Sequence, residues 1–244
     1  MKRGNQYLKI KRIQWFWLLL MIIAVYFGFS LTGFARNNDT VLIKDMLGRE
    51  VKIPAKIQKV VGIEAGALRI LVYLDAAQMV VGVEDTERKD ITKPYLMAHP
   101  ELSKLPSVGP IHGGDAELIV AQKPEVIFWT YTTKGSADSL QQKTGIPVVV
   151  LNYGDLDNQK NTFYEALRLT AKVLNRQSRA EHLISYIEAS IKNLGERTQN
   201  ALKNEMVYVG GINYRGSHGI TSTEPEYAPF RYVNAQNVAS GIAL

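Results

Sequence analysis

Residues 126–151, VIFWTYTTKGSADSLQQKTGIPVVVL, contain the clearest indication of the fold class. Residues 126–130 and 147–151 are short runs rich in β-branched and aromatic side chains, which is typical of buried strands. Residues 136–144 between them predict a helix, and Gly145 stands at the position where a left-handed residue commonly ends one. A strand, a helix and a second strand in this order predict a parallel sheet covered on both faces, in an α/β fold.

The same alternation continues toward the N-terminus, where a hairpin with a Gly-containing turn precedes it. Asp115 is a plausible N-cap for a short helix. The expected elements are a hairpin that pairs 41–43 with 51–53, strands at 60–63 and 79–83, and helices at 67–74 and 115–122.

Helical spacing of apolar residues then runs from residue 162 to about 205. Asn175 can end a first segment, and Ser178 to Glu181 form a capping-box pattern that restarts the helix. We expect this helix to pack along a globular fold, because its polar face lacks the charge pattern of a coiled coil. A strand at 206–209, a loop and a short helix near 230–234 follow it.

The basic charge of the chain belongs to its N-terminus. The sequence has 29 Lys and Arg against 23 Asp and Glu, and six of the cations lie in residues 1–36, which contain no acidic residue. The remaining residues include as many basic as acidic side chains, so the charge of the chain gives no support for nucleic-acid binding. Basic residues up to Arg12 precede an apolar run, and this order is typical of an export signal or a membrane anchor. We expect residues 1–36 to be one or the other.

Several classes of site are excluded by composition and motif. The sequence has no cysteine, so it has no disulfide, no thiolate metal site and no cysteine nucleophile. The motifs G-x-S-x-G, G-x-G-x-x-G after the first strand, the P-loop and H-E-x-x-H are absent. We therefore expect no catalytic residue. The histidines lack the close spacing of a metal cluster, so we expect no metal site and no cofactor.

Three stretches together resemble one family. Residues 45–54 are close to the pattern D-x-x-G-R-x-V-x-[IV]-P, and residues 59–83 form the strand-helix-strand unit that follows it. Gly109-Pro110 and then residues 115–127 are close to a helix that ends in A-L-K-P-D-V-I. In order and spacing, these stretches are similar to the chelate-binding, TroA-like periplasmic binding proteins of ABC importers. One position departs from the pattern, because Arg69 stands where many relatives have Glu.

The resemblance implies two Rossmann-like lobes joined by a long rigid interdomain helix. The expected domains are a signal or anchor at 1–36, a first lobe at 41–155, the interdomain helix at 160–205 and the start of a second lobe at 206–244. The second lobe is expected to be incomplete, because one strand and a short helix cannot bury an apolar face. The implied function is binding, outside the cytoplasm, of an iron complex (siderophore or haem) or a cobalamin-like chelate. The implied partners are an ABC permease, its ATPase, this chelate or corrinoid, and the membrane through the N-terminal segment.

Candidate ligand residues follow the predicted strands, because ligands of open α/β sheets bind beyond the strand carboxyl ends. Aromatic rings, guanidinium groups and backbone amides suit a large, partly apolar and often anionic chelate. The candidates are Glu64, Gly66, His112, Tyr131 and Tyr153 in the first lobe, and Tyr214, Arg215 and His218 in the second.

Two other classes of function stay open at this point. A membrane-anchored extracellular sensor or binding module fits an uncleaved anchor equally well. An α/β enzyme is less favoured, because the catalytic motifs named above are missing.

Overall fold

A computed structural model describes residues 39–200, 206–212 and 219–242. The predicted signal or anchor at 1–36 lies outside these residues, as do the candidate ligand residues Tyr214, Arg215 and His218. Within the described part of the chain, no helix combines the length and the apolarity needed to cross a bilayer.

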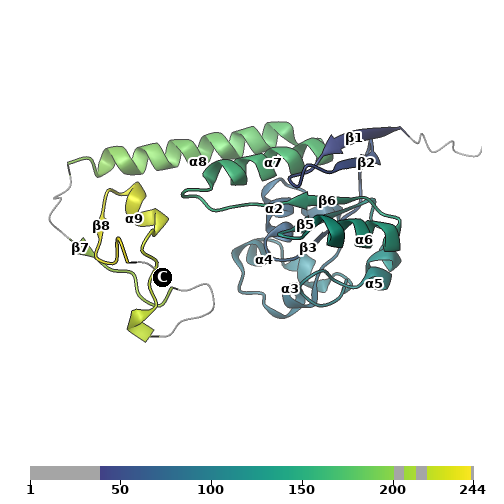
Figure 1. The fold of residues 1–244 in the computed structure, drawn as a ribbon, viewed down its shortest axis with the longest axis horizontal. Coiled ribbons are helices and arrows are strands. Elements are labelled where there is room, and N and C mark those ends of the chain that lie inside the picture. Colours follow the sequence, from purple (N-terminus) through teal and green to yellow (C-terminus); the bar gives the residue numbers. More distant parts are fainter. Residues whose placement is uncertain (1–38, 201–205, 213–218, 243–244) are drawn as a thin grey trace, which may run out of the picture. The chain divides into compact units, whose positions relative to one another are not determined.

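A parallel sheet lies at the centre of the fold (Figure 1). Its four strands run in the order β4-β3-β5-β6, with Val61 opposite Ile127 and Phe128 opposite Val149. The strands are β3 (Val60–Ile63), β4 (Val80–Gly82), β5 (Val126–Thr130) and β6 (Val148–Leu151). This sheet confirms the α/β class and the parallel arrangement predicted from residues 126–151.

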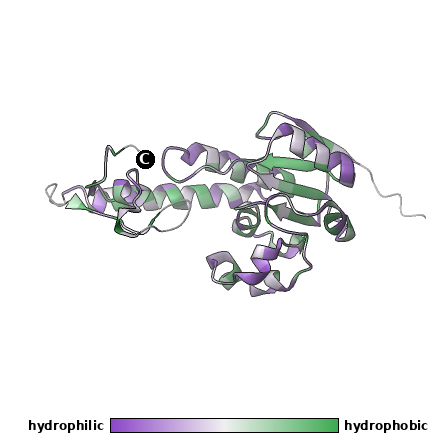
Figure 2. Cartoon of the chain, turned by 60° about the horizontal axis from the view of Figure 1, so that its bottom comes forward, coloured by the Kyte–Doolittle hydropathy of each residue, from purple (hydrophilic) through white to green (hydrophobic). Residues whose placement is uncertain are grey.

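The sheet is apolar on both faces, as its continuous β-branched strands predict. Phe128 and Val149 face one core with Leu71 and Leu167 from two helices, whereas Ile127 faces a second core on the opposite side. Figure 2 shows the strands mostly in green, whereas green and purple residues alternate along the helices. Burial on two faces makes the sheet a rigid base for the loops at its edges.

The helices that cover the sheet include those predicted and two that were not. Asp115 caps α5 by accepting hydrogen bonds from the N–H groups of Glu117 and Leu118, and Gly145 ends α6 at φ 69°. The covering helices are α2 (Ala67–Tyr73), α5 (Ala116–Ala121) and α6 (Lys134–Thr144), with α3 (Asp85–Lys89), α4 (Pro94–Ala98) and 3-10 turns at Ala77–Met79 and Pro100–Lys104 as the additional elements.

The predicted hairpin forms from β1 (Thr40–Lys44) and β2 (Glu50–Pro54), which pair antiparallel with Ile43 opposite Val51. Its turn is fixed to the sheet by the buried side chains of Asp45 and Arg49. Asp45 accepts a hydrogen bond from the N–H of Val150, and Arg49 donates one to the carbonyl oxygen of Val148. The hairpin is thereby attached to the outer strand β6.

The predicted end of a first helical segment at Asn175 is confirmed, whereas the expectation of one long helix over residues 160–205 needs correction. The structure has two helices, α7 (Lys160–Leu174) and α8 (Gln177–Arg197), and the chain reverses between them at Asn175, which is left-handed at φ 56°. Arg168 binds Glu181 through hydrogen bonds of 2.7 and 2.9 Å, and Tyr164, one turn earlier on α7, contacts Glu188, which lies further along α8. The two helices are therefore antiparallel. The predicted capping box is also wrong, because α8 begins at Gln177 and the Glu181 carboxylate contacts α7 instead.

The described residues after 205 also differ from the prediction. The predicted strand is present as β7 (Met206–Val207), but it pairs in parallel with β8 (Gln236–Asn237), which was not predicted. The short helix is α9 (Ala228–Tyr232), preceded by a 3-10 turn at Gly219–Thr221. The backbone of β7 therefore has a partner on one side, and the expectation of one strand in this segment is wrong.

Candidate functional site

Five of the eight candidate residues lie in the loops at the carboxyl edge of the sheet. Glu64 directly follows β3, Tyr131 follows β5, and Tyr153 comes two residues after β6. Because these strands are parallel, their carboxyl ends meet at one edge. Gly66 stands between β3 and α2, and His112 lies in the Gly-rich turn before α5 and contacts Glu64. The parallel strands thus bring together residues that are far apart in the sequence, since Glu64 and Tyr153 are separated by 89 positions.

Tyr131 and Tyr153 form an aromatic pair at this edge. Their ring centroids are 4.7 Å apart with an interplanar angle of 73°, an edge-to-face arrangement. Gly66 makes the pair possible, because at φ 87° its backbone passes so close to the Tyr153 ring that any Cβ would overlap it. The guanidinium carbon of Arg69 lies 5.0 Å from the centroid of the same ring, within cation–π distance.

Glu64 and His112 form a second contact at the edge. The His112 Nδ1 lies 2.9 Å from a carboxylate oxygen of Glu64, and the histidine side chain is exposed. Both residues have left-handed backbones, with φ 71° at Glu64 and 77° at His112, and Tyr131 does too at φ 50°. Such conformations cost of order 1–3 kcal/mol each for a non-glycine residue and gather at binding sites and switches.

Beneath this pair lies Glu84, which follows β4 and is 2% exposed. One of its carboxylate oxygens accepts a hydrogen bond of 3.0 Å from the backbone N–H of Glu64. Burial raises the pKa of the Glu84 carboxyl from 4.5 to about 7. Hydrogen bonds from the N–H groups of Glu64 and Gly113 act against the rise, and the negative charges of Glu64 and Glu87 add to it.

We expect Glu84→Gln to increase the free energy of unfolding by about 1–3 kcal/mol at about pH 8, and by much less at about pH 4. A carboxyl group with a higher pKa in the folded protein than in the unfolded chain binds its proton more tightly when folded. Its stabilising contribution is full below about 4.5 and is lost as the pH rises through about 7. Gln keeps an oxygen to accept the Glu64 N–H and removes the buried charge. Urea denaturation across this pH range measures the effect.

Glu117→Gln is the control for the loss of one negative charge, because Glu117 is exposed on α5. We expect it to change the free energy of unfolding by less than about 0.5 kcal/mol at every pH. The expectation for Glu84 is wrong if the Gln variant is equally destabilised at low and high pH, which would indicate a lost hydrogen bond rather than a removed charge.

The chemistry of this edge is that of a binding surface. Among the described residues, no group of three or more His, Asp and Glu side chains could hold a metal ion. The edge offers two aromatic rings, one imidazole with a carboxylate partner, and the guanidinium group of Arg69. A ligand that already carries its metal within a chelator suits such groups, because the protein then has to recognise only the outer surface of the complex.

Sequence reasoning did not select Glu84 or assign a role to Arg69. Glu84 directly follows the strand expected at 79–83, so the rule that selected Glu64 would also have found it. The sequence marks Arg69 only as the residue that stands where many relatives have Glu. Its position toward Tyr153 depends on how α2 packs beside β6, which a local sequence pattern does not contain.

Comparisons with known proteins agree with this fold. The sequence matches the family of periplasmic binding proteins over residues 60–240. The molybdate-binding protein MolA of Haemophilus influenzae is 27% identical over 172 residues, which cover 64% of this chain and 49% of MolA. The chain thus spans about half the length of this curated relative.

Two solved structures are also similar. MolA bound to molybdate has a TM-score of 0.66 at 25% identity, and the match covers 83% of this chain and 67% of MolA. The siderophore-binding protein BauB, bound to ferric iron with two acinetobactin molecules, has a TM-score of 0.60 at 18% identity and matches 84% of this chain and 70% of BauB. At this identity BauB supports the fold alone.

Proposed function

Because the chain belongs to the periplasmic binding protein family, we propose that it is an extracytoplasmic substrate-binding protein that delivers a metal chelate to an ABC importer. The family and the relatives named above are binding proteins rather than enzymes. The proposed ligand is an iron complex, either a siderophore or haem, or a cobalamin-like corrinoid. The proposed partners are the permease and the ATPase of the importer.

The aromatic pair at the carboxyl edge of the sheet is the observation that carries this proposal. Tyr131 is 52% exposed although it packs against Tyr153, so part of its ring surface remains open to a ligand. Ring-rich and partly apolar ligands gain most from such surfaces. His112, which is exposed beside Glu64, adds a polar contact on the same edge.

In this proposal residues 41–155 form one wall of the ligand site. The segment from residue 206 onward forms the facing wall, with Tyr214, Arg215 and His218 directed at the ligand. Residues 1–36 export the protein or hold it at the membrane. All of these roles follow from the sequence pattern and stay predictions.

A tetrahedral oxyanion such as molybdate is the second candidate ligand, because MolA is a molybdate-binding relative. The electrostatics of the described edge disfavour it. The Glu64 carboxylate lies at the edge. The pKa of Glu84 is raised to about 7, so this second carboxyl group is mostly charged above about pH 7. A small dianion next to these groups is repelled, whereas a large chelate spreads its charge over a wide surface.

We expect the purified protein to bind one of three chelates, namely a ferric siderophore, haemin or cobalamin, in a titration that covers dissociation constants from about 1 μM to about 1 mM. Tyr131→Ala and Tyr153→Ala should each weaken that binding about tenfold, which corresponds to the loss of an aromatic contact of about 1.4 kcal/mol. Isothermal titration calorimetry measures both, with sodium molybdate titrated in parallel.

Tyr131→Phe is the matched control, because it keeps the ring and removes only the hydroxyl group. We expect it to retain binding to within about threefold, an energy of about 0.6 kcal/mol. Binding of molybdate together with no response to any chelate would establish the second candidate. Chelate binding that is unchanged in both Ala variants would place the ligand away from this edge.

A further inference from the structure

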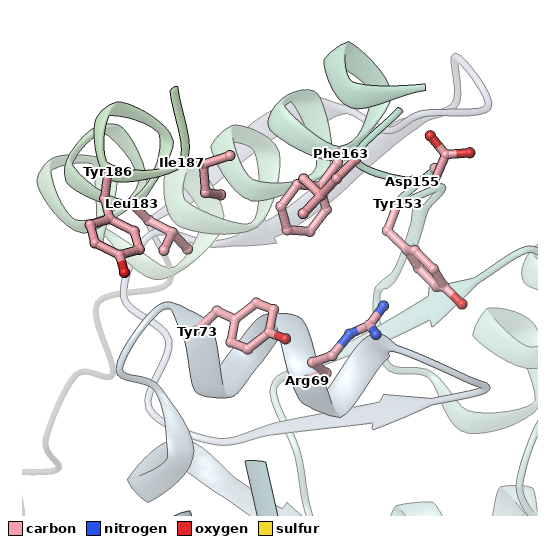
Figure 3. A pocket seen from close by; sticks show the side chains of 10 residues that line it. Arg69, Tyr73, Tyr153, Asp155, Phe163, Leu183, Tyr186 and Ile187 are labelled. Atoms are coloured by element: carbon pink, nitrogen blue, oxygen red, sulfur yellow. The ribbon is translucent and has the colours of Figure 1, made fainter. Parts of the chain in front are cut away.

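A cavity of about 540 Å³ lies between α2, the loop at 153–156 and the helices α7 and α8. Its lining is mostly aromatic and aliphatic, with Tyr73 on α2, Phe163 on α7, and Leu183 and Tyr186 on α8. Figure 3 shows these side chains directed toward one space, with Arg69 rising from α2 toward Tyr153. A volume of this size is within the range of small-molecule sites, about 300–1,000 Å³.

Arg69 is the cationic residue of this lining, and its charge has no counter-ion in the described part of the chain. Its Nε is buried and has no hydrogen-bond partner among the described residues. The guanidinium carbon lies 5.0 Å from the centroid of the Tyr153 ring, a cation–π contact that gives Nε no hydrogen-bond acceptor. A buried donor left unpaired costs about 1–3 kcal/mol, and more for a charged group.

The carboxylate that also lines the cavity is already engaged. Asp155 accepts hydrogen bonds from the backbone N–H groups of Asp157 and Gln159, at 2.8 and 3.0 Å, and so closes the turn that leads into α7. The described residues include no ion pair between Asp155 and Arg69. The guanidinium group is therefore available to an anionic group that enters from outside.

We propose that this cavity binds an amphipathic organic anion, with its aromatic or aliphatic body against Phe163, Leu183 and Tyr186 and its carboxylate or sulfonate on Arg69. The apolar lining favours the body of such a molecule at about 25 cal/mol per Å² of apolar surface removed from water. The acid group supplies the acceptor that the Arg69 Nε lacks.

This anion site is separate from the proposed function, because it depends on the cavity and on Arg69 and not on a metal. Tyr153 lines this cavity, and its ring also contacts Tyr131, which is not part of the lining. A protein that binds no chelate could still bind the anion. The two proposals can therefore fail separately.

The test compares two fluorescent probes of nearly the same shape, the anion 8-anilinonaphthalene-1-sulfonate and the neutral N-phenyl-1-naphthylamine. We expect the full-length protein to bind the anion more tightly than the neutral probe. Arg69→Gln should weaken binding of the anion by about tenfold or more and binding of the neutral probe by less than about twofold, as expected for a charged hydrogen bond. Fluorescence titration measures both affinities.

Arg168→Gln is the control for the loss of a cation, because Arg168 is exposed and pairs with Glu181 on the neighbouring helix. It should leave both affinities unchanged. Far-UV circular dichroism and the melting temperature check that each variant is folded. If Arg69→Gln does not fold, Tyr186→Ser replaces it, because this side chain is 67% exposed and should tolerate the change while weakening both probes.

Two outcomes overturn the proposal. Equal affinity of the wild-type protein and a folded Arg69→Gln variant for the anionic probe would show that the guanidinium group is not the anion site. Failure of the wild-type protein to bind either probe would show that the cavity is not open to ligands in solution, for example because another part of the chain fills it.

Discussion

Asp45→Ala should lower the free energy of unfolding by about 3–5 kcal/mol, the usual cost of removing one partner from a buried ion pair. Arg49 and Asp45 are 6% and 5% exposed, and their charged groups are 2.9 Å apart. The variant leaves the guanidinium group buried without this carboxylate. It also removes the acceptor for the N–H groups of Leu47, Arg49 and Val150, of which the last belongs to β6.

Asp138→Ala provides the matched control in a urea denaturation series. Asp138 contacts the same arginine at 2.8 Å, but its side chain is 52% exposed, so water replaces the lost carboxylate. We expect it to cost less than about 1 kcal/mol, as surface ion pairs do. Similar losses for the two variants would mean that the hairpin is not held to the sheet by the buried carboxylate.

The ion pair of Asp45 and Arg49 also gives a physical reason for part of the sequence pattern at residues 45–54. In the stretch D-x-x-G-R, the Asp closes the turn and binds the Arg, while Gly48 has φ 76°, which favours glycine. The Arg49 side chain then reaches the carbonyl oxygen of Val148 on the outer strand. The motif therefore marks a structural attachment, and its presence predicts the fold rather than a ligand.

The parallel sheet could be predicted because its causes are local. Its strands are short apolar runs, and Asp115 and Gly145 mark the start and the end of two helices by their own chemistry. The reversal after α7 could not be predicted in the same way. Asn175 indicates where the helix ends, but the direction of α8 is set by contacts between residues far apart, such as Tyr164 with Glu188 at 3.0 Å.

The candidate site could likewise be predicted from the sequence only in part. Glu64, Tyr131 and Tyr153 could be predicted, because a residue that follows a parallel strand must lie at the carboxyl edge. The neighbours of these residues could not, because the contacts of Arg69 and the burial of Glu84 come from packing between elements. The short helices α3 and α4 were missed since each is only 5 residues long and too short to show a helical period.

Gly66→Ala should lower the free energy of unfolding by about 1.5–3.5 kcal/mol and should displace the Tyr153 ring. A left-handed backbone costs a residue with a Cβ about 1–2 kcal/mol, and Gly66 has φ 87°. The added Cβ would also overlap the Tyr153 ring, so the ring must move away from Tyr131 and lose an edge-to-face contact of about 0.5–1.5 kcal/mol. The near-ultraviolet circular dichroism of tyrosine reports this movement, and urea denaturation measures the loss of stability.

Gly145→Ala separates the two causes. Gly145 has φ 69°, but a Cβ at this position would meet no atom within 4 Å, so the variant carries the backbone cost alone, about 1–2 kcal/mol. The excess loss in Gly66→Ala is then the cost of moving Tyr153. Because Tyr153 contacts both Tyr131 and Arg69, Gly66→Ala should weaken the binding of a chelate at the sheet edge and of the anionic probe in the cavity, whereas Gly145→Ala should weaken neither. Equal losses of stability in the two variants, with tyrosine dichroism unchanged, would show that Gly66 does not hold the ring that the two proposed sites share.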